Sequence, residues 1–155
     1  MLTDDEIAEV TKVTVQHAAG RAMVIAADRQ WATPKEVAFA QYCREVGADL
    51  LMVFPPDWGG SCTVNSLVEH YAAVAEEIPV MLITCAFSLR DDAFGLEVMG
   101  ACRDHIPQVV AVKDDVCGAF ARQSRVAEWA PGGRYGWVFD EPEYGAGLEL
   151  AFRRA

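Results

Sequence analysis

The side chain with the clearest chemical potential is Lys113, which directly follows the wholly apolar run Val109–Val112. A lysine at the end of a buried strand is partly desolvated, and desolvation lowers the pKa of its ammonium group. The neutral amine that results is a nucleophile toward carbonyl carbons. Position alone also allows a plainer role, in which Lys113 forms an ion pair with Asp114 or Asp140.

Three further residues follow predicted strands, where sites form in folds with parallel sheets. Thr84 ends the apolar run Pro79–Thr84, and Arg90 lies in the loop beyond it. Trp58 lies in a Gly-rich loop after another apolar run. We predict that Arg90, Trp58 and Thr84 contact a small ligand, although Trp58 has an equally good role in packing. No metal site is expected, because the cysteines and histidines lack metal-ligand spacing.

Helix-forming segments alternate with short apolar segments along the chain, which predicts an α/β fold. Strands are expected at residues 22–27, 49–54, 79–84, 109–112 and 134–139. Helices are expected at about residues 4–20, 33–46, 92–105, 120–129 and 149–154, with a further one from Asn65 or Ser66 to about Val74. Strands that are apolar throughout indicate a parallel sheet covered by helices. We expect one domain over residues 1–155.

Periodicity leaves two architectures open, an open doubly wound sheet and part of a (β/α)8 TIM barrel. No GxGxxG or GxxxxGK[ST] motif occurs, which weighs against a nucleotide-binding open sheet.

Composition excludes several classes of partner. The formal net charge of −10 argues against binding to nucleic acid or an anionic membrane surface. No apolar run approaches the roughly 18 residues of a membrane span. The acidic start of the chain does not resemble a signal peptide. The five cysteines form no CxxC pair, so we expect free thiols and a cytoplasmic protein.

Four segments, in order, resemble the dihydrodipicolinate synthase / N-acetylneuraminate lyase family. Gly47–Pro56 resembles the family's "GAD…PP" strand, and Glu69–Tyr71 resembles the helix leading to its fifth strand. Val109–Asp114 resembles the strand that carries its Schiff-base lysine, and Leu2–Glu6 resembles the start of its second barrel helix. The order and spacing of these segments are more specific than any one of them.

The resemblance implies a partial (β/α)8 barrel of about five parallel strands, corresponding to the family's strands three to seven. It implies a lyase or aldolase that acts on a 2-keto acid such as pyruvate through an imine at Lys113. Arg90 would then bind the substrate carboxylate, Trp58 would form a pocket wall, and no cofactor would be needed. It also implies a homo-oligomer, because family members are usually tetramers built from dimers.

The chain departs from the family pattern at two features of the site. The family's proton-relaying tyrosine falls at Ile83, which has no ionisable group. Its Gly-Thr-rich carboxylate-binding motif would precede Leu2 and has no counterpart in the sequence. Proton relay of this kind is typically worth 10²–10⁴-fold in rate. A non-catalytic truncated barrel that serves in binding or assembly therefore remains an alternative, as does an unrelated open sheet with a site at its strand ends.

Five strands cannot close a barrel that needs eight, so we predict self-association or a partner that covers the open side. The first and fifth strands would be edges, which proteins normally cover or pair. The side chains expected to face water on that side are Val24, Leu51 or Met52, and Val110 or Val112. The alternative is a flattened sheet with helices on both faces.

Overall fold

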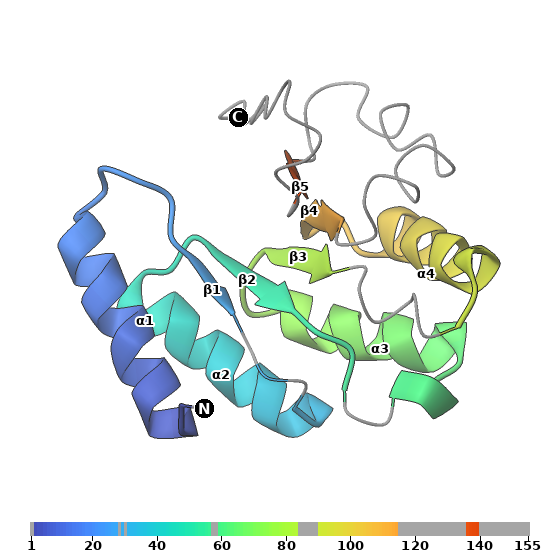
Figure 1. The fold of residues 1–155 in the computed structure, drawn as a ribbon, viewed down its shortest axis with the longest axis horizontal. Coiled ribbons are helices and arrows are strands. Elements are labelled where there is room, and N and C mark those ends of the chain that lie inside the picture. Colours follow the sequence, from blue (N-terminus) through green and yellow to red (C-terminus); the bar gives the residue numbers. More distant parts are fainter. Residues whose placement is uncertain are drawn as a thin grey trace.

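The structure, a computed structural model, describes residues 2–27, 29, 31–56, 59–83, 90–114 and 136–139. In these residues helices alternate with strands (Figure 1). The helices are α1 (Asp4–Ala18), α2 (Thr33–Val46), α3 (Val64–Ala75) and α4 (Asp92–His105), with a 3-10 turn η1 (Gly59–Ser61). The strands are β1 (Ile25–Ala27), β2 (Leu50–Val53), β3 (Val80–Ile83), β4 (Val109–Asp114) and β5 (Gly136–Phe139). The helices predicted at 120–129 and 149–154 lie outside the described residues.

The ends of α1 and α2 follow the predicted signals. At the start of α1 the Thr3 hydroxyl accepts from the Glu6 amide at 3.3 Å, and the Glu6 carboxylate accepts from the Thr3 amide at 2.7 Å. This reciprocal capping box satisfies two donors that have no partner within the helix. α2 ends at Gly47, whose φ of +90° is the left-handed conformation that glycine adopts readily.

The boundaries of β1 and α3 differ from the prediction. β1 begins at Ile25 rather than at residue 22. The amide of Val24, just before the strand, donates to the Asp49 carboxylate at 2.8 Å. α3 begins at Val64, earlier than Asn65 or Ser66, because Thr63 is its N-cap. Ser66 completes that cap, since its hydroxyl accepts from the Thr63 amide at 3.0 Å. A serine in place of the usual Glu or Gln hides this capping box in the sequence.

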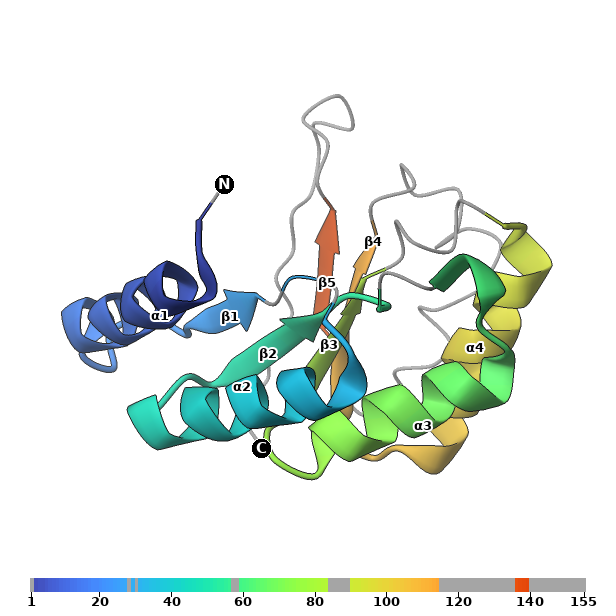
Figure 2. The same cartoon turned by 90° about the horizontal axis from the view of Figure 1, so that it is seen from below.

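All the described strands are parallel and adjacent in chain order, β1-β2-β3-β4-β5. A doubly wound sheet would reverse its strand order at a switch point, and this sheet does not. The helices form an arc outside the strands (Figure 2). The chain is therefore a partial (β/α)8 barrel, as predicted, and the flattened alternative is not seen in the described part.

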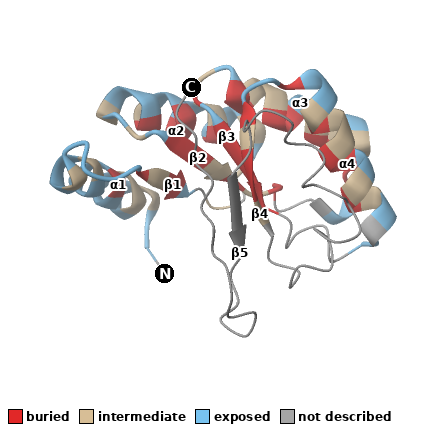
Figure 3. Ribbon diagram, turned by 90° about the horizontal axis from the view of Figure 1, so that it is seen from above, coloured by how far each residue is buried: buried red, intermediate tan, exposed pale blue. Residues whose placement is uncertain are grey.

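The sheet has two apolar faces. One packs on the helices and forms a large core with residues of α2, α3 and α4, among them Phe39, Leu67 and Met99. Figure 3 shows the buried residues on the strands and on the helix sides that face them. The opposite face is here called the inner face. Its members are Ile25, Leu50, Met52, Met81, Val110 and Ala111.

This division decides between the predicted barrel-facing alternatives. Leu51 and Val112 pack in the helix-side core, while Met52 and Val110 belong to the inner face. Val24 is buried, and Met52 and Val110 are half-buried. Val24 is therefore not exposed as predicted, whereas Met52 and Val110 are partly exposed on the inner face. Successive residues of a strand point to opposite faces, and the run of apolar residues in β2 could not show which set faces which side.

No described helix is long and apolar enough to cross a membrane.

Candidate active site at the carboxyl end of the sheet

Lys113 lies near the carboxyl end of β4, the interior strand between β3 and β5. It is in register with Ile83 of β3 and with Val138 of β5. β4 continues through Asp114, so the strand is longer than the predicted run that ends at Val112. Lys113 is half-buried, although the residues before it, Ala111 and Val112, are almost fully buried.

The Lys113 side chain belongs to the inner face. Ala111 lies on that face, and residues two apart on a strand share a face. The same alternation places Ile83 beside it, two residues after Met81. Ile83 is only 3% exposed. The neighbour of Lys113 on β3 is thus a buried aliphatic side chain, at the position where the family resemblance places a proton-relaying tyrosine.

Arg90 connects two loops at this end of the sheet. It precedes α4, and its guanidinium donates to the Cys62 carbonyl, in the connection between β2 and α3. The guanidinium also lies over the Phe94 ring, 3.6 Å from the ring centroid. A guanidinium carries five N–H donors, so the bond to Cys62 does not by itself prevent a second, anionic partner.

Cys62 lies beside this contact but is a poor candidate for a nucleophile. The residue is 3% exposed, and burial raises the pKa of its thiol. A hydrogen bond from Ser66 and the charge of Arg90 oppose this shift and are weaker. The thiolate is the reactive form of cysteine, so burial keeps this side chain inert.

Trp58 and Thr84, the other predicted ligand contacts, lie outside the described residues. Their roles stay predictions. No group of three or more His, Cys, Asp or Glu side chains suited to a metal ion occurs in the described ranges.

A buried polar contact near the site was not predicted. His70 of α3 is 2% exposed, and its Nδ1 lies 2.8 Å from the Thr33 hydroxyl at the start of α2. Burial lowers the pKa of His70, and a hydrogen bond with the Phe54 backbone opposes that shift. The sequence contained a signal, because His70 falls on the apolar helical stripe of Leu67 and Val74.

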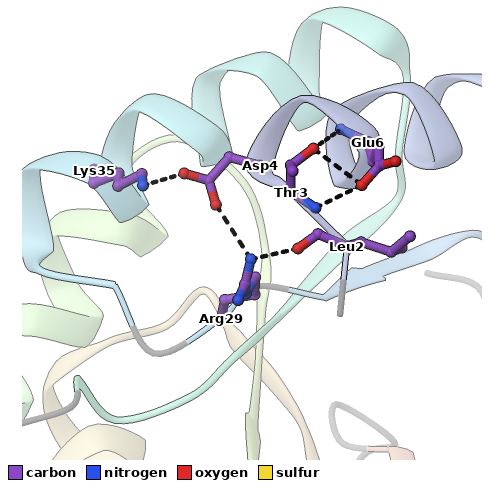
Figure 4. Close-up of polar contacts among 6 residues, drawn as sticks. All are labelled: Leu2, Thr3, Asp4, Glu6, Arg29 and Lys35. Atoms are coloured by element: carbon purple, nitrogen blue, oxygen red, sulfur yellow. Dashed lines mark hydrogen bonds and ion pairs between the residues drawn. The ribbon is translucent and has the colours of Figure 1, made fainter.

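An ion-pair network joins α1 to α2 at the same end (Figure 4). Asp4 lies between Lys35 and Arg29, and Arg29 also donates to the Leu2 carbonyl at 2.5 Å. The hydrogen bond from Lys35 lowers the pKa of Asp4. Lys35 also lies over the Trp31 ring, 5.0 Å from its centroid. Lys35 is thus engaged by Asp4 and Trp31 at the start of α2.

The sequence profile of the Dihydrodipicolinate synthetase family matches residues 1–131. The chain belongs to this family. A 4-hydroxy-tetrahydrodipicolinate synthase from Mesorhizobium japonicum is 33% identical over 129 residues, which are 82% of this chain and 42% of the relative. The family resemblance inferred from the sequence is therefore confirmed.

Two solved structures share the fold. A dihydrodipicolinate synthase from Bacillus anthracis matches with a TM-score of 0.76 and 21% identity, over 91% of this chain and 47% of the other. An N-acetylneuraminate lyase from Fusobacterium nucleatum, complexed with pyruvate, matches with a TM-score of 0.75 and 16% identity, over 92% and 47%. This chain spans less than half the length of the relatives it matches.

Proposed function

We propose that this chain carries the nucleophile of an imine-forming lyase or aldolase that acts on a 2-keto acid such as pyruvate. One observation carries the proposal. In a chain of this family, Lys113 lies half-buried at the carboxyl end of an interior strand, on the inner face of the sheet. That is the end at which barrel enzymes form their active sites.

The proposed chemistry begins at the Lys113 amine, which in its neutral form is a nucleophile toward carbonyl carbon. The lysine Nζ attacks the keto carbon, a carbon–nitrogen bond forms, and the carbonyl oxygen leaves as water. The resulting imine withdraws electrons from the neighbouring carbon, which can then lose a proton or a carbon substituent. No cofactor is needed for this step.

Arg90 is the proposed partner of the substrate carboxylate, because guanidinium and carboxylate can pair through two parallel hydrogen bonds. Its bond to Cys62 would hold the guanidinium at the carboxyl end of the sheet. Trp58 and Thr84 complete the proposed set as a pocket wall and a polar contact.

The aliphatic side chain of Ile83 limits the expected rate. A positioned acid–base group typically contributes about 10²–10⁴-fold, and Ile83 cannot supply one. We therefore propose that imine formation at Lys113 is retained and that turnover is slow unless another group moves the proton.

Reductive trapping tests the proposal. Borohydride reduces an imine to a secondary amine, so pyruvate and borohydride together should add the mass of pyruvic acid less one oxygen atom at Lys113. Lys113→Arg should abolish the adduct, because a guanidinium cannot serve as the amine. Lys12→Arg, on the exposed face of α1, is the matched control and should retain it. An adduct of equal yield in Lys113→Arg would overturn the proposal.

We also propose that the chain is a homo-oligomer. β1 and β5 each have one neighbour in the described sheet, and open edges of this kind are normally covered or paired. Sedimentation at micromolar concentration should give a mass above that of one chain. A stable monomer would contradict the proposed assembly and leave the chemistry at Lys113 unaffected.

A further inference from the structure

The outward face of α1 carries exposed apolar side chains. Val10 is 53% exposed and Val13 is 50% exposed. The opposite face of the helix packs inward, where Ile7 and Ala8 contact the helix-side core and Thr11 is buried. α1 lies at one end of the arc of helices, with α2 on one side and no described helix or strand on the other (Figures 1 and 2). Another protein surface can therefore reach the outward face.

The two valines belong to a longer stripe on this face, here called the α1 seam. Its four members follow one another at spacings of four, three and four residues, and all are exposed: Glu6, Val10, Val13 and His17. Single exposed apolar residues are common and need no partner. This spacing is more specific, because it aligns side chains along one side of a helix and is the spacing at which helices meet in a coiled coil.

The α1 seam is complementary to a reversed copy of itself. Its carboxylate, Glu6, lies toward one end, and its imidazole, His17, lies toward the other. Suppose that two α1 helices pair antiparallel about a twofold axis midway between Val10 and Val13. Val10 of each copy then meets Val13 of the other, and Glu6 of each copy meets His17 of the other. An imidazole N–H can donate to a carboxylate. Such mutual pairing is what a twofold interface requires.

We propose that the α1 seam is a docking surface for a second copy of this chain, whose own α1 lies antiparallel to it. The inference rests on the proposed homo-oligomer and assigns it a helix surface, distinct from the strand edges. The pair is weak and reversible. A helix of 15 residues is only about 22 Å long, which is small for an interface. The formal net charge of −10 on each chain also opposes association.

Sedimentation equilibrium of the full chain, over a wide range of concentrations, measures the affinity. The double variant Val10→Ala with Val13→Ala changes four apolar side chains in each dimer and should weaken association by roughly tenfold or more. Alanine has a higher helix propensity than valine, so α1 should still form. Met23→Ala is the control, because Met23 is equally exposed, at 51%, but lies between α1 and β1. It should leave the affinity unchanged.

Carbodiimide cross-linking of the His17→Lys variant tests the antiparallel register. Glu6 and residue 17 are eleven residues apart, about 16 Å along one helix, too far for a direct amide bond within one chain. A bond between Glu6 and the lysine introduced at position 17 therefore joins two copies, and peptide mass spectrometry should detect it. Glu6→Gln in the same variant should abolish that bond and can keep the capping box. The pair of Glu9 and Lys12, 3.9 Å apart, is the positive control for the reagent.

The outcomes separate this inference from the proposals on which it rests. A monomer at every concentration would overturn both the α1 seam and the proposed homo-oligomer, and it would leave the chemistry at Lys113 unaffected. An oligomer that the double variant at Val10 and Val13 leaves intact would overturn the seam alone. Equal weakening by Met23→Ala would do the same. Absence of the bond between Glu6 and position 17 would rule out the antiparallel pairing.

Discussion

Buried His70 should make the stability of the fold depend on pH near and below the ordinary pKa of histidine. The ring is 2% exposed, and burial lowers its pKa below the ordinary value of 6.5. The unfolded chain therefore binds a proton at this residue more readily than the folded chain does. Stability is fully present above pH 6.5 and is lost as the pH falls from there through the lower folded pKa.

The magnitude has an upper bound. One proton taken up only by the unfolded state changes the free energy of unfolding by at most about 1.4 kcal/mol per pH unit. Urea unfolding followed by circular dichroism at about pH 7.5 and about pH 5.5 brackets the ordinary pKa of histidine. We expect the free energy of unfolding to fall between them by no more than about 1.4 kcal/mol, with most of the loss below pH 6.5.

A pair of matched variants isolates the residue responsible. His70→Gln removes the titrating ring and should flatten the pH dependence, whatever its effect on absolute stability. His17→Gln makes the same change on the exposed end of α1 and should leave the dependence intact. An unchanged pH dependence in His70→Gln would show that His70 is not its source, because the protons would then be taken up elsewhere.

Two further predictions concern the fold. Leu51→Ala leaves a cavity in the helix-side core and should lower the free energy of unfolding by about 2–5 kcal/mol. Met52 is half-buried, so Met52→Ala should lower that free energy by less. Urea unfolding of both variants measures the difference, and equal losses would contradict the assigned faces. Thr63→Ala removes the N-cap of α3 and should cost about 0.5–2 kcal/mol. Exposed Asn65→Ala is its control in thermal unfolding and should be nearly neutral. Equal losses in these two variants would count against the cap.

The order and approximate bounds of the helices and strands were predictable because the sequence signals for them are local. The capping box of Thr3 and Glu6 and the stop at Gly47 each depend on a few neighbouring residues. Apolar runs likewise located the strands, with errors of a few residues at their ends. The Val24 amide, just before β1, donates to the carboxylate of Asp49, which is distant in sequence. No local pattern indicates this hydrogen bond.

The site was predictable in part for the same reason. Lys113 could be found from one apolar run, since the end of a parallel strand is a functional position. Its pairing with Ile83 depends on a register shift between β3 and β4 near Val80 and Met81. The contact of Arg90 with the Cys62 carbonyl joins two loops through a backbone atom, which leaves no residue-type signal.

Deuterium exchange at the methyl group of pyruvate tests most directly whether Lys113 performs catalysis in this chain. An imine at Lys113 acidifies that methyl group, so its proton NMR signal should decay in deuterated water at a rate proportional to protein concentration. We expect slow exchange in the unmodified chain, since Ile83 offers no proton relay, and none above background in Lys113→Arg. Exchange that persists in Lys113→Arg, or its absence in the unmodified chain, would contradict the assignment of Lys113 as the catalytic nucleophile.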